Sequence, residues 1–556
     1  MKAGNKLKSI VMVLAAAALL FGLVAAGQAF RTGRGMEILV NMFRELSLYY
    51  VDEVDPDRLL EDAAGGMVKS LDPYTEYISE ENMEGFQQMT TGKYGGVGSL
   101  IRQDGDYVRF AEPYMGSPAD KAGIRIGDRI LEIEGKDGKG MTTTQVSDML
   151  KGDPGTTVRL IIEKFYTGET EELKIRREII ARSGIPFYGM VNDSVGYITH
   201  SDFTEDCSGD MRNAIMALKG KGARALIIDY RGNGGGIMQE AVKIVSFFVP
   251  KGTEVVSMRG RSAETSATFV TQNEPIDMDI PLALLVDGGS ASAAEIVVGA
   301  LQDLDRAVLI GNRTYGKGLV QSPRYLGYNS YIKLTTAKYY LPSGRCIQAV
   351  DYASRNEDGG VANVPDSLVS EFHTRLGRKV YDGGGVMPDS VLTIDYVSRF
   401  AYLVYGLGHV SEFADIYSKE NQNKDIVPGE FVFTAEEYSR FVEFMSDKEV
   451  VWESDTQRSL KLLREKAAQE RYLDDIEEEL AAIGSKLKDD KLSSLELYSE
   501  ELRELIENEI ILRRAYSEGV SEHNFRKNKP IIAAAGLLAD RETCARILSS
   551  KDTDRK

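Results

Sequence analysis

The chain has 556 residues, of which 43% are hydrophobic and 27% are charged, so it is long enough for several domains and has the composition of a folded protein. Acidic residues outnumber basic ones by 85 to 67, and a net charge of -18 repels phosphate backbones, which excludes a general nucleic-acid binder. The three cysteines and four histidines lack the spacing of a disulfide framework or a zinc site. We therefore expect free thiols, no metal and no cofactor.

The first thirty residues have the pattern of an export signal. Three lysines precede an unbroken apolar run at residues 10–27, and Gly27-Gln28-Ala29 is suitable for signal cleavage. The apolar run is also just long enough to span a bilayer. Residues 1–30 are therefore predicted to be a cleaved signal peptide or a retained inner-membrane anchor. In either case the rest of the chain is exported to the periplasm or the cell envelope.

Two regions with different sequence patterns follow the signal. Residues 36–91 place apolar side chains at helical spacing around a turn at Val54-Asp55-Pro56-Asp57, which predicts a helical N-terminal unit. Residues 92–178 are punctuated by glycine and predict a compact β-rich domain. Its strands are expected at residues 94–98, 107–110, 129–133 and 157–162.

The third region, residues 179–394, alternates apolar strands with helices. Strands are expected at residues 196–199, 225–229, 282–286 and 307–310, and helices at residues 238–248 and 293–301. This alternation predicts an α/β layer with a mainly parallel sheet. A polar insertion at residues 349–382 interrupts it, and the pattern assigns that insertion no role.

The last region, residues 395–556, is helical and charged. Apolar side chains recur every three or four residues at Tyr472, Ile476, Leu480, Ile483 and Leu487, which predicts an amphipathic helix. We interpret this region as a helical extension, either a solvated cap or a dimerisation arm, without chemistry of its own.

A serine nucleophile is indicated where the strand at residues 282–286 meets the following helix. Tiny residues lead through Ser290 to Ser292, which stands at the start of that helix. Free amides and the positive end of the helix dipole can stabilise an oxyanion there. The alternative is that Ser290 or Ser292 only caps the helix.

The candidate base is Lys317, which lies between two glycines just beyond the strand at residues 307–310. A lysine held in an apolar pocket loses its proton more easily and can then deprotonate a serine hydroxyl. The alternative is a solvated or phosphate-binding lysine, but Gly-Lys-Gly lacks the spacing of a phosphate-binding loop.

Together the two segments resemble the C-terminal processing peptidase family. The resemblance rests on Ser-Ala-Ser-Ala-Ala-Glu-Ile at residues 290–296 and on Thr-Tyr-Gly-Lys-Gly-Leu-Val-Gln at residues 314–321. It implies that Ser292 is the nucleophile, that Lys317 is the base, and that Gln321 orients the lysine. Ser290 aligns with a position where the family also accepts threonine, which makes it the weaker nucleophile candidate.

A third motif resembles the same family. Residues 229–236 read Asp-Tyr-Arg-Gly-Asn-Gly-Gly-Gly, which is similar to the family's Asp-x-Arg-x-Asn-x-Gly-Gly. The resemblance implies an oxyanion hole made by the amide of Ala293 and that of Gly235 or Gly236. A dinucleotide fingerprint is the alternative, but the contiguous glycines lack its spacing. Family segments are found over roughly residues 40–395.

Residues 92–178 resemble a PDZ domain, through Tyr94-Gly-Gly-Val-Gly and through the segment at residues 117–130. The resemblance implies partner peptides with apolar C-termini, bound as an added strand. The residues expected to hold the terminal carboxylate and the last side chain are Gly95, Gly96, Val97, Gly98, Val146 and Leu150. The alternative is a β-domain that serves only as a spacer.

The predicted fold is multidomain α+β: an α/β peptidase core with a ClpP/crotonase-like layer, an inserted PDZ domain, a helical N-terminal unit and a helical C-terminal extension. The implied function is a serine endopeptidase that works through an acyl-enzyme. One rival is a catalytically silent PDZ scaffold, which would have lost Ser292, Lys317 or Gln321, although the chain has all three. A nucleotide-dependent enzyme is a second rival. Family analogy also suggests a homodimer through the helical arms.

Overall fold

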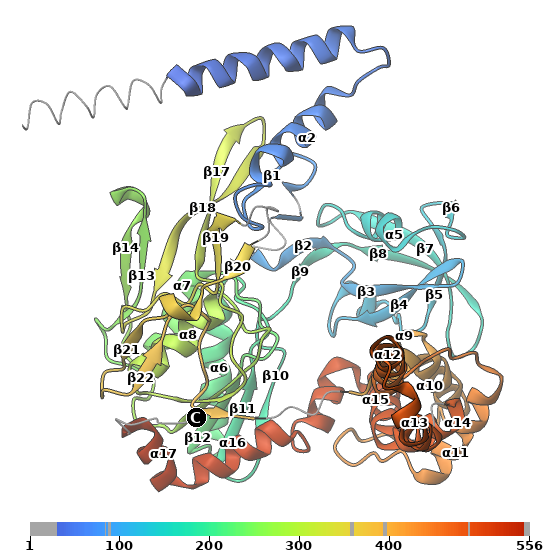
Figure 1. Cartoon of the computed structure of the whole chain (residues 1–556). Coiled ribbons are helices and arrows are strands. Elements are labelled where there is room, and N and C mark those ends of the chain that lie inside the picture. Colours follow the sequence, from blue (N-terminus) through green and yellow to red (C-terminus); the bar gives the residue numbers. More distant parts are fainter. Residues whose placement is uncertain are drawn as a thin grey trace, which may run out of the picture. The chain divides into compact units, whose positions relative to one another are not determined.

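Figure 1 shows a computed structural model of the chain, which describes residues 30–83, 85–86, 91–355, 361–392, 397–487 and 490–549. The apolar run at residues 10–27 lies outside these ranges. Within them, no helix combines the length and the apolar composition that a membrane span needs. The chain divides into two compact units, one made of Met1–Met83 with Gln321–Thr335 and one made of the remaining residues.

The first unit is not purely helical, in contrast to the prediction for residues 36–91. It contains a helix at residues 30–49 and α2 (Pro56–Val68), which begins where the Asp55 carboxylate accepts hydrogen bonds from two backbone amides. It also contains β1 (Glu76–Ile78), which pairs antiparallel with β18 (Ser330–Tyr340). Because that partner strand lies some 250 residues further along the chain, local periodicity could not reveal the pairing.

The peptidase core is built on a six-stranded sheet in the order β10-β11-β12-β15-β16-β23. Every pair from β11 to β23 is parallel and only β10 is antiparallel, which confirms the predicted, mainly parallel sheet. All residues of β12 and β15 are buried, as expected of central strands covered on both faces. The strands are β10 (Phe187–Met190), β11 (Val195–Thr199), β12 (Ala225–Asp229), β15 (Leu282–Val286), β16 (Val308–Gly311) and β23 (Ser390–Val391).

Different segments of the chain cover the two faces of this sheet. Leu226 and Ile228 pack with α6 (Cys207–Gly220), α7 (Met238–Ser246) and α8 (Ala293–Asp303). Ala225 and Ile227 point to the other face, where they pack with α16 (Lys529–Ala539) and α17 (Arg541–Ser549). The prediction that residues 395–556 form only an extension is therefore wrong for their last part, because α16 and α17 complete the peptidase core.

A second sheet and two hairpins flank the core. The second sheet pairs β13 (Glu254–Gly260) with β14 (Ala267–Val270) and with the end of β18, and β17 (Leu319–Gly327) also pairs with β18. The insertion at residues 349–382 forms hairpins. Their strands are β19 (Val350–Arg355), β20 (Val361–Asn363), β21 (Glu371–His373) and β22 (Lys379–Tyr381).

The PDZ region is an antiparallel sheet in the order β3-β4-β5-β7-β8, with β3 at one edge. Its entry strand β2 (Lys93–Gly96) pairs with its exit strand β9 (Glu178–Ala181), as an inserted domain requires. The other elements are β3 (Ser99–Asp104), β4 (Tyr107–Pro113), α4 (Pro118–Lys121), β5 (Arg129–Ile133), β6 (Lys136–Asp137), α5 (Thr143–Leu150), β7 (Thr157–Glu163) and β8 (Thr170–Arg176).

A separate helical domain follows the core and has its own aromatic interior around Phe413, Phe433 and Phe441. Helix α13 covers the predicted amphipathic segment, with Leu480 buried. Helix α15 contains a kink at Tyr516. The helices are α9 (Arg399–Gly406), α10 (His409–Glu420), α11 (Ala435–Phe444), α12 (Asp455–Glu470), α13 (Leu473–Lys486), α14 (Lys491–Leu497) and α15 (Ser499–Asn524).

Candidate active site

Ser292 stands between β15 and α8 in a strained conformation. Its φ of 57° and ψ of -115° lie where few residues other than glycine are found, and such strain is common at functional sites. Helix α8 begins at the next residue, Ala293. The serine is largely buried, with 9% of its surface exposed. This geometry presents a single hydroxyl at the positive end of a buried helix.

Ser290 has a different environment, because it is fully buried and its hydroxyl is used within the turn. The hydroxyl donates to the backbone oxygen of Tyr230 at 2.8 Å and accepts from the amide of Asp287 at 3.0 Å. Ser290 therefore holds the turn together, and Ser292 is the serine that stands at the helix start.

The glycine-rich loop after β12 is held by its own side chains. The Asp229 carboxylate accepts bonds from the backbone amide of Arg231 at 3.0 Å and from its guanidinium at 2.6 Å. Asn233 donates to the backbone oxygen of His200 at 2.7 Å and accepts from the amide of Gly235 at 2.8 Å. Residues 229–235 are thus a fixed turn, because polar side chains hold the backbone in place.

This loop is fastened to the serine turn. The amide of Ala291 donates to the backbone oxygen of Asn233 at 2.8 Å, and the amide of Gly232 donates to the Asp287 carboxylate at 2.9 Å. A Cβ atom at Gly235, where φ is +101°, would lie 2.7 Å from the Cβ of Ser292. Only glycine allows this approach of the two turns.

The hydrogen bonds of the glycine-rich loop reduce the number of backbone amides that can serve as the predicted oxyanion donors. The amide of Gly235 is already taken by Asn233, so the interpretation of Gly235 as a donor is wrong for this conformation. Among the described residues, the amides of Gly236 and Ala293 donate to no other group. These two remain as the predicted donors.

A buried carboxylate joins the serine turn to the lysine loop. One oxygen of Glu295 accepts from the amides of Ser292 at 2.9 Å and of Lys317 at 2.8 Å. Its other oxygen accepts from the amide of Gly316 at 2.7 Å and from the hydroxyl of Thr314 at 2.5 Å. Burial raises the pKa of Glu295, and these hydrogen bonds act against that rise.

Sequence reasoning did not assign this role to Glu295, although the residue stands within the motif that we quoted. Its spacing of three residues after Ser292 is that of a capping box and was the signal available. Lys317 itself is half-buried at the end of its loop. Glu295 therefore acts on the site by positioning the backbones of Ser292 and Lys317.

Gln321 lies in the first unit, where its amide donates to the Thr335 hydroxyl at 3.3 Å. That hydroxyl donates in turn to the Asp72 carboxylate at 3.2 Å. The predicted bond from Gln321 to Lys317 stays a prediction.

The expected PDZ residues fall into two groups. Gly95 and Gly96 belong to β2, and Gly98 follows it with a φ of +77°. Val97, Val146 and Leu150 are buried in the hydrophobic core of the domain. Their expected contact with the last residue of a peptide stays a prediction.

The cysteine and histidine side chains are the remaining candidates for chemistry. Cys207, Cys346 and Cys544 form no disulfide in this structure. Within the described ranges, no cluster of three His, Cys, Asp or Glu side chains has the geometry to hold a metal. His200 is fully buried below the glycine-rich loop, and burial lowers its pKa to about 3, so it is neutral.

An α/β sheet that brings a strained serine, a glycine-rich loop and a lysine loop together defines a serine-type peptidase. Comparisons with protein families agree. The model described as "Peptidase family S41" matches residues 194–353, that for "PDZ domain" matches residues 109–164, and that for "Probable PDZ-protease, C-terminal helical domain" matches residues 402–538. The last match extends the family resemblance beyond residue 395.

Among curated relatives, the "Carboxy-terminal-processing protease" of Bartonella bacilliformis is 35% identical over 314 residues, which cover 56% of this chain and 72% of the relative. The "Probable CtpA-like serine protease" of Staphylococcus aureus is 35% identical over 310 residues, covering 55% of this chain and 61% of the relative. The solved photosystem II D1 C-terminal processing protease is 24% identical, covers 64% of this chain and 87% of its own, and has a TM-score of 0.35. The chain belongs to peptidase family S41, among the carboxy-terminal-processing proteases with a PDZ domain.

Proposed function

We propose that this protein is an endopeptidase that cleaves peptide bonds with a Ser292-Lys317 dyad. One observation carries the proposal: a single oxygen of Glu295 accepts hydrogen bonds from the amides of both Ser292 and Lys317. A shared acceptor holds the two loops in a fixed mutual position, which is what a nucleophile and its base require.

The proposed reaction has two halves. Neutral Lys317 takes the proton of the Ser292 hydroxyl as its oxygen attacks the substrate carbonyl carbon, and the developing oxyanion accepts bonds from the amides of Gly236 and Ala293. The protonated lysine then gives its proton to the leaving amine, and an acyl ester remains on Ser292. Water, deprotonated by Lys317, attacks this ester and releases the carboxylic acid together with the free serine. Gln321 is proposed to orient the lysine.

We further propose that the PDZ domain selects protein substrates by their apolar C-termini. Strand β3 is an edge of the PDZ sheet and has backbone groups available for an added strand. Because Val97, Val146 and Leu150 are buried, entry of a terminal side chain among them requires α5 to move away from β3.

The location and the assembly are proposals as well. The lysine-flanked apolar run at residues 10–27 supports export to the periplasm or cell envelope, with that run either cleaved or kept as an inner-membrane anchor. The exposed apolar side chains of the helix at residues 30–49, such as Met36, Val40 and Leu48, support a homodimer through the helical arms. Sedimentation of the exported part with and without residues 30–50 tests the dimer.

The first test is degradation of a loosely folded reporter with an apolar C-terminal tail. We expect the wild-type protein to cut it and the Ser292→Ala and Lys317→Ala variants to be inactive. The matched control is Ser290→Ala, which weakens a buried turn but leaves the nucleophile, so its folded fraction should cut. Acid-quenched mass spectrometry should find the acyl adduct on the peptide that contains Ser292. If Ser290→Ala were the only variant to lose this adduct, that result would contradict the assignment of Ser292 as the nucleophile.

A catalytically silent scaffold is the competing function. It predicts that the wild-type protein and all three variants bind the tail equally and that none of them cuts it.

A further inference from the structure

A cavity of about 710 Å³ lies beside the glycine-rich loop, and three domains form its walls. Gly235 and Gly236 line it from the peptidase core, and Tyr94 and Tyr114 line it from the PDZ domain. The third wall comes from α15, through Tyr516 and Glu518. The residues of this third wall belong to the region matched by the C-terminal helical domain model, whose description states no role for it.

The backbone of α15 is distorted where it reaches the cavity. Tyr516 interrupts the helix with a φ of 57° and a ψ of -171°, a conformation that costs a residue other than glycine about 1–3 kcal/mol. Contacts with the PDZ domain hold it there. The Tyr516 hydroxyl lies 3.3 Å from Asp120, and Ser517 donates to the Glu112 carboxylate through its amide at 2.7 Å and its hydroxyl at 2.6 Å.

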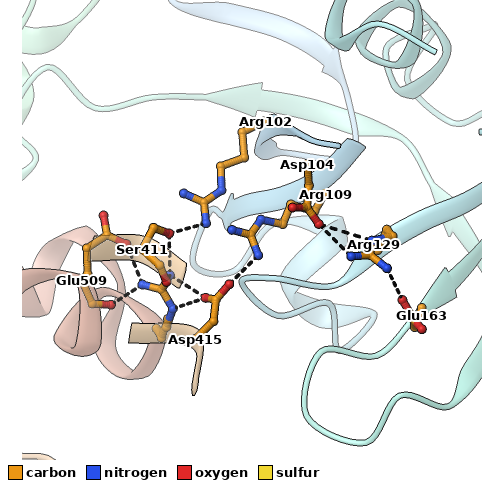
Figure 2. A network of polar contacts seen from close by, with 9 residues as sticks. Arg102, Asp104, Arg109, Arg129, Glu163, Ser411, Asp415 and Glu509 are labelled. Atoms are coloured by element: carbon orange, nitrogen blue, oxygen red, sulfur yellow. Dashed lines mark hydrogen bonds and ion pairs between the residues drawn. The ribbon is translucent and has the colours of Figure 1, made fainter. Parts of the chain in front are cut away.

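The turn before the kink is anchored by a buried ionic network (Figure 2). Arg513, a buried residue of α15, binds Asp415 at 2.6 Å and Glu509 at 2.6 Å. The PDZ residue Arg109 binds the other oxygen of Asp415 at 2.6 Å, and Arg102 of the same domain donates to Ser411 at 2.6 Å. The PDZ domain and the helical domain therefore share one carboxylate, which fixes the start of the kink.

The chain after the kink is fastened to the peptidase core. Phe525 stacks on Tyr197 with ring centres 5.9 Å apart, and Asn528 accepts a bond from Arg231 at 3.3 Å. Arg231 belongs to the glycine-rich loop itself. Residues 516–518 are thus held on both sides, so the wall that they form has a defined position relative to that loop.

The charge of the cavity suggests what it accepts. Among the described residues, the carboxylates of Glu112, Asp202 and Glu518 line it against one cation, Arg182, which lies over the ring of Tyr114 at 5.3 Å. The Glu112 carboxylate already accepts hydrogen bonds from Ser517, whereas the Glu518 side chain is exposed. A basic side chain beside Glu518 is attracted, and an acidic one is repelled.

We infer that α15 of the C-terminal helical domain supplies one wall of the substrate cavity, and that Glu518 on it selects substrates with a basic side chain near the scissile bond. The inference rests on the proposed peptidase function and adds a specificity-determining residue to it. It predicts that charge at this wall changes the choice of substrate and leaves the chemistry of Ser292 intact.

The test compares internally quenched peptides that share one sequence and one apolar C-terminus and carry Lys or Glu at each position around the cleavage site. The ratio of kcat/KM for the Lys and Glu peptides is measured for the wild type, Glu518→Lys and Glu518→Gln. The matched control is Glu522→Lys, which makes the same charge change on an exposed residue of the same helix outside the cavity. Binding of the same peptides to Ser292→Ala, with and without Glu518→Lys, is measured by fluorescence anisotropy.

We expect Glu518→Lys to lower the Lys-to-Glu ratio about threefold to tenfold at one or two neighbouring positions, with a smaller effect in Glu518→Gln and less than about a twofold change in Glu522→Lys. About 1 M salt should suppress the effect. Equal shifts in the Glu518 and Glu522 variants, or no shift at any position, would overturn the inference. If the wild-type protein cleaves none of the peptides, the proposed dyad is wrong. The ratio of the binding affinities for the Lys and Glu peptides, measured by anisotropy, then still decides the role of Glu518.

Discussion

Replacing Glu295 tests how the active site is positioned. The carboxylate accepts four hydrogen bonds, from the amides of Ser292, Gly316 and Lys317 and from the hydroxyl of Thr314. Glu295→Ala removes the acceptor of all four donors, three of which are buried, while the Lys317 amide is partly buried. Glu295→Gln keeps the shape but replaces one oxygen with an NH₂ group that cannot accept.

The two variants should differ in size of effect. A buried donor without a partner costs about 1–3 kcal/mol, so the three buried donors alone should make Glu295→Ala lower the free energy of unfolding by at least about 3 kcal/mol. In Glu295→Gln the amide nitrogen is better placed toward Thr314, whose hydroxyl can accept. The Gly316 amide is then left unpaired, and the Thr314 hydroxyl must turn its own proton to another acceptor. We expect that variant to lose about 1–3 kcal/mol and to keep the bonds to Ser292 and Lys317.

Activity should follow the same order. A displacement of about 1 Å at a catalytic group can cost about a hundredfold in rate, so kcat/KM of folded Glu295→Ala should fall by at least that factor, and that of Glu295→Gln should fall less. The assay is peptide turnover per folded molecule, with urea unfolding beside it. Asp303→Ala is the control, because it removes a buried acid at the other end of α8, where Asp303 pairs with Arg345. Wild-type turnover by folded Glu295→Ala would refute the positioning role.

Three further perturbations follow from the same structure. Burial lowers the pKa of His200 to about 3, below its unfolded value near 6.5, so the stability that neutral His200 contributes is present above about pH 6.5 and is lost on acidification. The free energy of unfolding of the wild type, measured by chemical unfolding, should therefore fall by about 2 kcal/mol between pH 7 and pH 5. The His200→Leu variant should not show this fall. Gly235→Ala places a Cβ atom 2.7 Å from that of Ser292 and should lower kcat/KM by about a hundredfold. The control is Gly234→Ala, which should be nearly neutral because no atom lies within 4 Å of its added Cβ, and equal activities of the two variants would contradict the close approach. Arg513→Met leaves the buried Glu509 carboxylate without its cation and leaves Asp415 paired with Arg109 alone, so it should cost about 3–5 kcal/mol in urea unfolding. A loss below about 1 kcal/mol would show that the network is not buried in solution.

Local pattern was sufficient for the central elements of the core. The strands expected at residues 225–229 and 282–286 are β12 and β15, with the same bounds. Both strands are buried on two faces, so the sequence shows a continuous apolar run at each of them. Helix α8 also begins where expected, at Ala293, since a turn of tiny residues separates it from β15.

Elements whose partners are distant in sequence were not predictable in this way. An apolar stripe shows that α16 buries a face, but it does not name the sheet that the face covers. Likewise β1 reads as part of a helical unit until its pairing with β18 is known. Val97, Val146 and Leu150 match a binding pattern, yet packing within the PDZ domain buries them.

The sequence by itself carried the family resemblance, because the residue types and spacings at residues 290–296 and 314–321 are those of a peptidase motif and can be recognised without the fold. The tertiary structure decided how that motif is held and surrounded. Glu295 is one carboxylate in a motif until the fold brings the lysine loop to it. Tyr516 and Glu518 reach the cavity only because Arg513 and Phe525 fasten the two sides of the α15 kink. The contacts of Phe525 with Tyr197 and of Ser517 with Glu112 join residues more than 300 positions apart, and only three-dimensional packing specifies them.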